Sequence, residues 1–127
     1  MRKVITFEEA CEALKLNPVT VIPDFSVFPE KHQKAMAAHA KLIIIVEAVN
    51  DGWTPNWDDT NERKFELWPD IEKDETKPSG FGLSYDDCAY WTSNTDVGSR
   101  LCFKSREAAE HTFETFKQLY EDYLLIG

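Results

Sequence analysis

Basic residues are scarce in this sequence: 14 Lys and Arg stand against 23 Asp and Glu, for a formal net charge of −9. A protein that binds nucleic acid gains most of its affinity from Lys and Arg that neutralise phosphates. The chain lacks the basic stripe that such binding requires, so we do not expect it to bind DNA or RNA in the ordinary way. The acidic excess is concentrated in residues 51–96, which carry twelve acidic and four basic side chains and all four Trp.

Long apolar runs are also missing. The longest, Leu42–Val46, is far too short to cross a bilayer. The first residues, MRKVITFEEACEALK, are charged and then amphipathic, without the apolar core of a signal peptide. We therefore expect an intracellular protein that makes no contact with a membrane.

The three cysteines, Cys11, Cys88 and Cys102, do not have the spacing of metal ligands. Cys88 and Cys102 could face each other across a hairpin, so one disulfide is compatible with the sequence. Their apolar and aromatic neighbours favour buried free thiols instead.

Metal-ligating and catalytic patterns are absent as well. His32 and His39 lie seven residues apart, whereas ligands on one helix are normally three or four apart, and His111 is expected near an exposed helix face. The acidic run at 58–62 lacks the central Gly and distant Glu of an EF-hand loop. The neighbours Asp86 and Asp87 would point to opposite faces of a regular strand, which argues against a catalytic carboxylate pair. We expect no enzymatic activity, no metal and no cofactor.

The sequence does contain clear signals for helix ends. Thr6 and Glu9 have capping-box spacing and predict a short helix at about 6–15. Pro29 and Glu30 suit the start of a long helix that continues to Val49, before a stop at Asn50-Asp51-Gly52. Ser105 can cap a final helix. The expected apolar stripe of the long helix is Met36, Ile43, Val46 and Val49, widened by Ala35, Leu42 and Ile45.

Between the long helix and the last one, the pattern predicts strands at about 64–70, 81–92 and 99–104. The last two should form a hairpin, and 71–80 a charged loop. Residues 19–28 are an extended connector or edge strand around Pro23. The expected fold is α+β: one domain spanning 1–127, with a small antiparallel sheet of about three strands packed against the long central helix and the C-terminal helix.

The stretch GFGLSYDDCAYW, residues 80–91, makes up most of the expected strand 81–92 and has a mixed pattern. Alternation places Phe81, Leu83, Tyr85 and Trp91 on the inner face, where they are expected to pack with Leu101 and Phe103 of the next strand. Asp87 then falls on the same inner face. A bulge near Asp86-Asp87 would reset the alternation, and we expect one.

The strongest candidate for a functional surface is the acidic, Trp-rich middle of the chain. Aromatic rings beside Asp and Asn suit a protein hot spot or sugar stacking, although most such rings serve as core. The candidate binding residues are Trp53, Trp57, Asp58, Asp59, Trp68, Asp86 and Tyr90.

Four segments carry a resemblance to a known family: GWTPNW, KFELWP, SGFGLS and, most specifically, VGSRLCFKS, which is followed by the helix FKQLYEDYLL. Over roughly residues 48–126 the chain resembles small uncharacterised proteins of phages, prophages and mobile elements of anaerobic gut bacteria. The resemblance implies the cytoplasm of a bacterial host as the setting. It brings no catalytic residues and no substrate.

We therefore expect a phage-type, non-enzymatic accessory protein that binds a macromolecular partner, such as a basic host or phage protein, through its acidic, Trp-rich middle. A nucleic-acid mimic would be the sharper form of this hypothesis. One alternative is a carbohydrate- or small-ligand-binding module that uses the same rings. Another is single-stranded nucleic-acid binding by aromatic stacking, for which only a few cations could line a groove. A homodimer through the rings is also conceivable.

Overall fold

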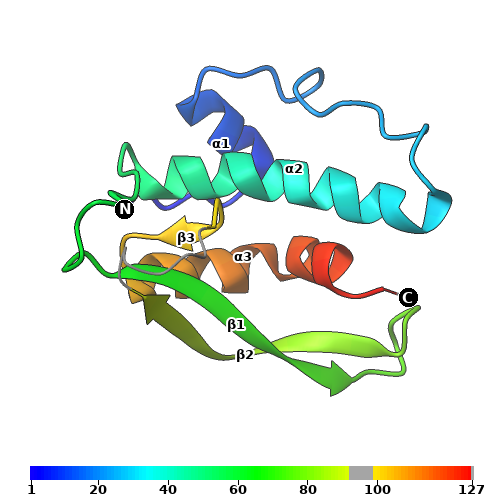
Figure 1. Ribbon diagram of the computed structural model, residues 1–127. Coiled ribbons are helices and arrows are strands. Elements are labelled where there is room, and N and C mark those ends of the chain that lie inside the picture. The colour runs from blue at the N-terminus through cyan, green and yellow to red at the C-terminus, as the bar shows by residue number, and fades with distance from the viewer. Residues whose placement is uncertain (92–98, 127) are drawn as a thin grey trace.

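The computed structural model describes residues 1–91 and 99–126, and for residues 86–91 it describes the backbone alone. Within these residues the elements are α1 (Phe7–Ala13), α2 (Glu30–Asn50), β1 (Lys64–Lys73), β2 (Phe81–Trp91), β3 (Cys102–Phe103) and α3 (Arg106–Leu124). Helix α2 contacts α1 on one side and α3 on the other, and α3 contacts every strand (Figure 1). The α+β architecture is as predicted.

The predicted helix ends are confirmed. The Thr6 and Ser105 hydroxyls each accept a hydrogen bond, at 3.1 Å, from the backbone N–H three residues further on. Such caps satisfy amide groups that the first helical turn leaves without partners. Helix α2 ends at Asp51, whose φ of 49° is left-handed, and Gly52 follows with a φ of 89°. This conformation suits glycine and is tolerated by Asp.

The predicted stripe of α2 is partly right. Leu42, Ile45, Val46 and Val49 are buried, but Ala35, Met36 and Ile43 are only partly so. Because α2 is covered by α1 on one side and α3 on the other, small residues on more than one face are buried too. The buried apolar residues of α2 are Ala38, Leu42, Ile45, Val46, Ala48 and Val49.

The predicted hairpin between the second and third strands is wrong. The strand order is β2-β1-β3, so β1 is central and β3 pairs with it, through Phe65↔Phe103 and Glu66↔Cys102. Neighbours in sequence are usually neighbours in a sheet, but here β3 takes the free edge of β1. Phe103 is fully buried, as expected.

The β1–β2 hairpin is longer than predicted, because β1 continues to Lys73 into the segment expected to be a loop. The pairing passes from Trp68↔Asp87 to Asp70↔Ser84, so two residues of β2 lie opposite Pro69 alone. This is the predicted bulge. Leu83 is buried and Tyr85 packs on Phe113 at a ring distance of 6.0 Å, as predicted.

Phe81, by contrast, is 43% exposed and not part of the inner face. The hairpin end that contains it extends along α3 towards the C-terminus of the chain (Figure 1). Glu121 of α3 fixes this region: its carboxylate accepts a hydrogen bond from the Leu83 N–H at 3.3 Å and pairs with Lys77 at 3.2 Å.

The remaining connections are irregular. Residues 19–28 form turns and bends, so the edge-strand alternative is wrong and the connector alternative holds.

The N-terminal segment is attached through Val4, whose carbonyl lies 3.0 Å from the His111 Nε2. His111 is therefore partly buried and anchors the N-terminal segment, which corrects its predicted exposed position. No helix among the described residues has the length and apolar character needed to span a bilayer.

Candidate functional site

The loop after α2 starts in a fixed geometry. The Trp53 N–H donates to the Asn50 carbonyl at 3.0 Å, closing the turn that Asp51 and Gly52 make. The Asn50 side chain in turn bridges two segments: its amide donates to the Cys102 carbonyl at 3.0 Å, and its oxygen accepts from the Lys104 N–H at 3.4 Å. The start of the loop is thus fastened to β3.

Glu62 organises the rest of this loop. Its carboxylate accepts a hydrogen bond from the Asn56 N–H at 2.8 Å and one from the Trp53 indole N–H at 3.4 Å, and it pairs with the Lys64 ammonium at 3.3 Å. Partial burial acts to raise the pKa of this carboxyl. The three donors outweigh that effect, so the pKa lies below its ordinary value.

Lys64 is the unexpected member of this arrangement. Its side chain is fully buried, and its ammonium also lies 3.2 Å from the Glu62 carbonyl and 3.4 Å from the Asp59 carbonyl. The Trp57 ring covers it, with the ammonium 5.4 Å from the ring centre, close enough for a cation–π interaction. A buried cation needs such partners. The sequence pattern gives no sign of this burial, because strand alternation places Lys64 on the face opposite the apolar Phe65 and Leu67.

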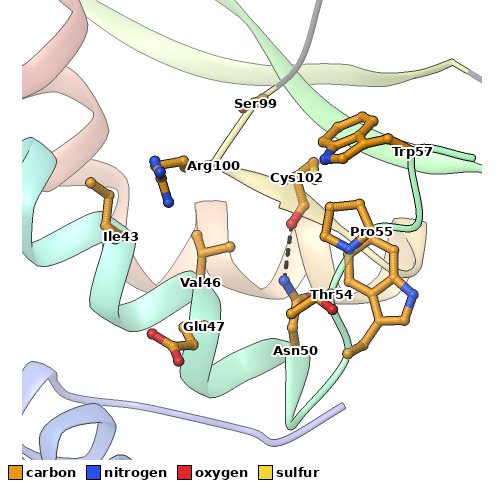
Figure 2. A pocket seen from close by; sticks show the side chains of 11 residues that line it. Ile43, Val46, Glu47, Asn50, Thr54, Pro55, Trp57, Ser99, Arg100 and Cys102 are labelled. Carbon is orange, nitrogen blue, oxygen red and sulfur yellow. Dashed lines mark hydrogen bonds between the residues drawn. The ribbon is translucent and has the colours of Figure 1, made fainter. Parts of the chain in front are cut away.

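A cavity of about 600 Å³ opens beside this loop (Figure 2). In Figure 2, Trp57 and Pro55 lie on one side of it, and Arg100 extends over α2 near Ile43 on the other. The Asn50–Cys102 hydrogen bond lies between them. The cavity is lined by Ile43, Val46, Glu47, Asn50, Trp53, Thr54, Pro55, Trp57, Ser99, Arg100 and Cys102.

Of the predicted binding residues, the fold brings Trp53 and Trp57 together in this cavity. Trp57 keeps 42% of its surface exposed. Asp58 and Asp59 are exposed on the same loop. We call the segment from Trp53 to Glu62 the Trp loop.

Trp68 lies outside the cavity, on β1, where 73% of its surface is exposed. The side chains of the last two candidates, Asp86 and Tyr90, lie outside the described residues. Their backbone belongs to β2, where Tyr90 pairs with Phe65 of β1.

Several acidic side chains of the middle region serve the fold. Asp51 forms an ion pair with Arg2 at 2.9 Å, and this contact holds the pKa of Asp51 below its usual value. Asp74 is bound by the hydroxyl and N–H of Thr76, which lower the pKa of its carboxyl. Glu62 forms an ion pair with Lys64. The acidic surface is therefore smaller than residue counts indicate, while Asp58 and Asp59, which directly follow Trp57 in the sequence, are exposed.

The cysteines and histidines that are described form no metal centre: within the described residues, no group of three or more His, Cys, Asp or Glu is placed to hold an ion. Cys11 and Cys102 are buried free thiols, and the side chain of Cys88 lies outside the described residues. Burial, with the nearby charge of Glu66, raises the pKa of Cys102 to about 11. Such a thiol is a poor nucleophile.

His39, predicted at the edge of the core, stacks on Tyr123 with 4.4 Å between ring centres.

Comparison of the chain with protein-family models, curated proteins and solved structures finds no significant match. What the protein does must therefore be argued from its own geometry.

Proposed function

We propose that this protein is a non-enzymatic binding protein whose contact surface for a basic macromolecular partner is formed by the Trp loop and Trp68. The observation that carries the proposal is the exposure of Trp57 beside the exposed Asp58 and Asp59 on one loop, together with a second exposed ring, Trp68, on β1. Large aromatic side chains beside polar ones dominate the binding energy of protein interfaces.

The Trp loop is also held in one shape before any partner arrives. Glu62 binds the loop at Trp53 and Asn56, and Lys64 binds it at Asp59. A surface that is already ordered loses little conformational freedom when it binds. The net charge of −9 favours a basic partner, because complementary charge speeds encounter and disfavours wrong partners.

The cellular setting that we propose is the cytoplasm of a bacterial host, in the service of a phage or mobile element. It is supported by the resemblance of VGSRLCFKS and its neighbouring segments. This setting would supply basic host and phage proteins as partners.

The test is a pull-down from bacterial lysate with mass-spectrometric identification of the bound proteins. It compares the wild type with the triple variant Asp58→Asn, Asp59→Asn, Trp68→Ser, and with Val27→Ser as a matched control. Val27 is 93% exposed on the connector, away from the Trp loop, so its replacement removes an exposed apolar side chain elsewhere.

We expect a basic protein that is retained by the wild type and the Val27 variant and lost from the triple variant. Raising the ionic strength from about 0.1 M to about 1 M, which shortens the Debye length from about 10 Å to about 3 Å, should release it. Equal retention by the triple variant, or no salt-sensitive partner at all, would refute the proposal. Binding of a glycan array by the wild type would favour sugar recognition by the same rings.

A further inference from the structure

A second cavity, of about 390 Å³, lies between α2, α3, β1 and the segment before β3. It meets the first one at Ser99 and Arg100, which line both. Its apolar wall comes from Leu67, Pro69, Leu101 and Leu124, and its polar groups from His39, Glu66, Ser99, Arg100, Tyr120 and Tyr123. A concave site that combines an apolar wall with a few polar groups suits a small ligand.

Two polar atoms of its lining residues are buried without a hydrogen-bond partner among the described residues: the Tyr120 hydroxyl and the His39 Nδ1. Tyr120 is only 3% exposed. An unsatisfied buried polar group costs roughly 1–3 kcal/mol, so folded proteins contain few of them. Two at one cavity mark it as a place where a polar ligand or water would complete their hydrogen bonds.

Glu66 supplies a carboxyl group to the same cavity. Burial raises its pKa, and a hydrogen bond from the Ser99 hydroxyl only partly offsets that effect. Its charge in turn acts on Tyr120, whose pKa is raised first by burial and then by Glu66. Both residues line this cavity, so a cation bound there would interact favourably with the Glu66 carboxylate and with the Tyr120 oxygen.

The three groups together define the chemistry of the ligand. The Glu66 carboxylate, the Tyr120 oxygen and the Nδ1 of neutral His39 can all accept hydrogen bonds. His39 is favoured in its neutral form because burial lowers its pKa. An ammonium group has three donors and no acceptor, so it matches these three acceptors. An anion in the same position would be repelled by Glu66, while Arg100, the cation of the lining, is exposed and also borders the first cavity.

We propose that this cavity binds a primary alkylammonium group through Glu66, Tyr120 and His39. The apolar wall suits the alkyl stem. The group can be supplied by a free amine or by a lysine side chain, and the two sources share this chemistry. The inference does not depend on the proposed partner of the Trp loop, because it uses a different cavity and different residues.

The probes are n-butylammonium, as the free amine, and Nα-acetyl-lysine methylamide, as the lysine side chain in a peptide-like setting. Their matched neutral controls are 1-butanol, with the same number of heavy atoms, and the Nε-acetylated lysine derivative. Binding is followed by NMR shifts of the His39 ring and of the backbone amides of Leu67 and Leu101. We expect saturable shifts with a dissociation constant in roughly the millimolar range for so small a ligand.

The variants assign the contacts. Glu66→Gln keeps the shape and removes the charge, and should weaken butylammonium binding roughly tenfold or more. Tyr120→Phe removes only the hydroxyl and should weaken it roughly threefold. Glu72→Gln, which removes an exposed charge at the far end of β1, is the matched control and should bind as the wild type does.

Tighter binding of the lysine derivative than of butylammonium would identify a lysine side chain as the source, and the reverse order a free amine. If 1-butanol shifts the same resonances equally, or Glu66→Gln binds the amine as the wild type does, the proposal is overturned. It is also overturned if neither amine binds, since water alone would then satisfy the buried groups.

Discussion

Replacing Lys64 by methionine removes the ammonium at the centre of the Trp loop and keeps most of the buried stem. Three groups lose their partner: the Glu62 carboxylate and the carbonyl groups of Asp59 and Glu62. Hydrogen bonds from charged donors contribute roughly 1.5–3 kcal/mol each, and breaking a buried ion pair costs about 3–5 kcal/mol. The contacts here are long, at 3.2–3.4 Å, and Glu62 is 24% exposed. We therefore expect a loss of about 2–4 kcal/mol.

The assay is urea unfolding followed by far-UV circular dichroism, with Trp fluorescence as a second probe. In a thermal unfolding experiment, the same loss of stability should lower the Tm of a chain of this length by roughly 8–15 °C. Lys73→Met is the matched control: it makes the same change at the exposed end of the same strand and should stay within about 0.5 kcal/mol of the wild type.

A double-mutant cycle of Lys64→Met with Glu62→Gln separates the ion pair from the carbonyl contacts. We expect a coupling energy of about 1 kcal/mol between the two residues. A Lys64 variant that unfolds within about 0.5 kcal/mol of the wild type would refute the reasoning, because the ammonium would then not hold the loop.

Three further predictions concern other buried groups. Burial lowers the pKa of His39, so the contribution of this residue to stability is present above the unfolded pKa of about 6.5 and is lost as the pH falls below it. His39→Gln should therefore flatten the decline in unfolding free energy between about pH 7 and pH 5. In a Cys88→Ser background, Cys11 and Cys102 should react with a disulfide reagent only after denaturation; rapid reaction in the native state would contradict their burial. Asn50→Ala should cost about 2–3 kcal/mol in urea unfolding, since it leaves the Cys102 carbonyl without its donor, and an unchanged midpoint would show that this bridge is dispensable.

The features that the sequence predicted well are local ones. The Thr6 and Ser105 caps and the turn at Asp51 depend on residues only a few positions apart, so their chemistry is visible in the sequence. The bulge at Pro69 was also predictable, because a regular strand would have turned an acidic residue inward. The α+β class followed from the order of these elements.

The errors come from contacts between distant segments. Nothing near Phe103 in the sequence indicates that it pairs with Phe65 on the far side of β1. The burial of Lys64 and Glu66 has the same origin: alternation assigns them to the solvent face, but the Trp loop and the helices cover that face at this end of the sheet. Trp53 and Trp57 were singled out from the sequence and line the first cavity, whereas the cavity that contains Glu66 and Tyr120 was not predicted.

The hydrogen bond from Asn50 to Cys102 has a consequence for how the chain can vary in length. It joins the last residue of α2 to the strand that leads into α3, so the intervening segment departs from the helices and returns to the same place. Lengthening such an excursion is entropically cheap, at about 0.6 kcal/mol for each doubling. The exposed residues Glu75 and Thr76, in the turn between β1 and β2, are therefore the point where the protein can accept inserted residues, or a fused domain, while α2 stays in contact with α1 and α3.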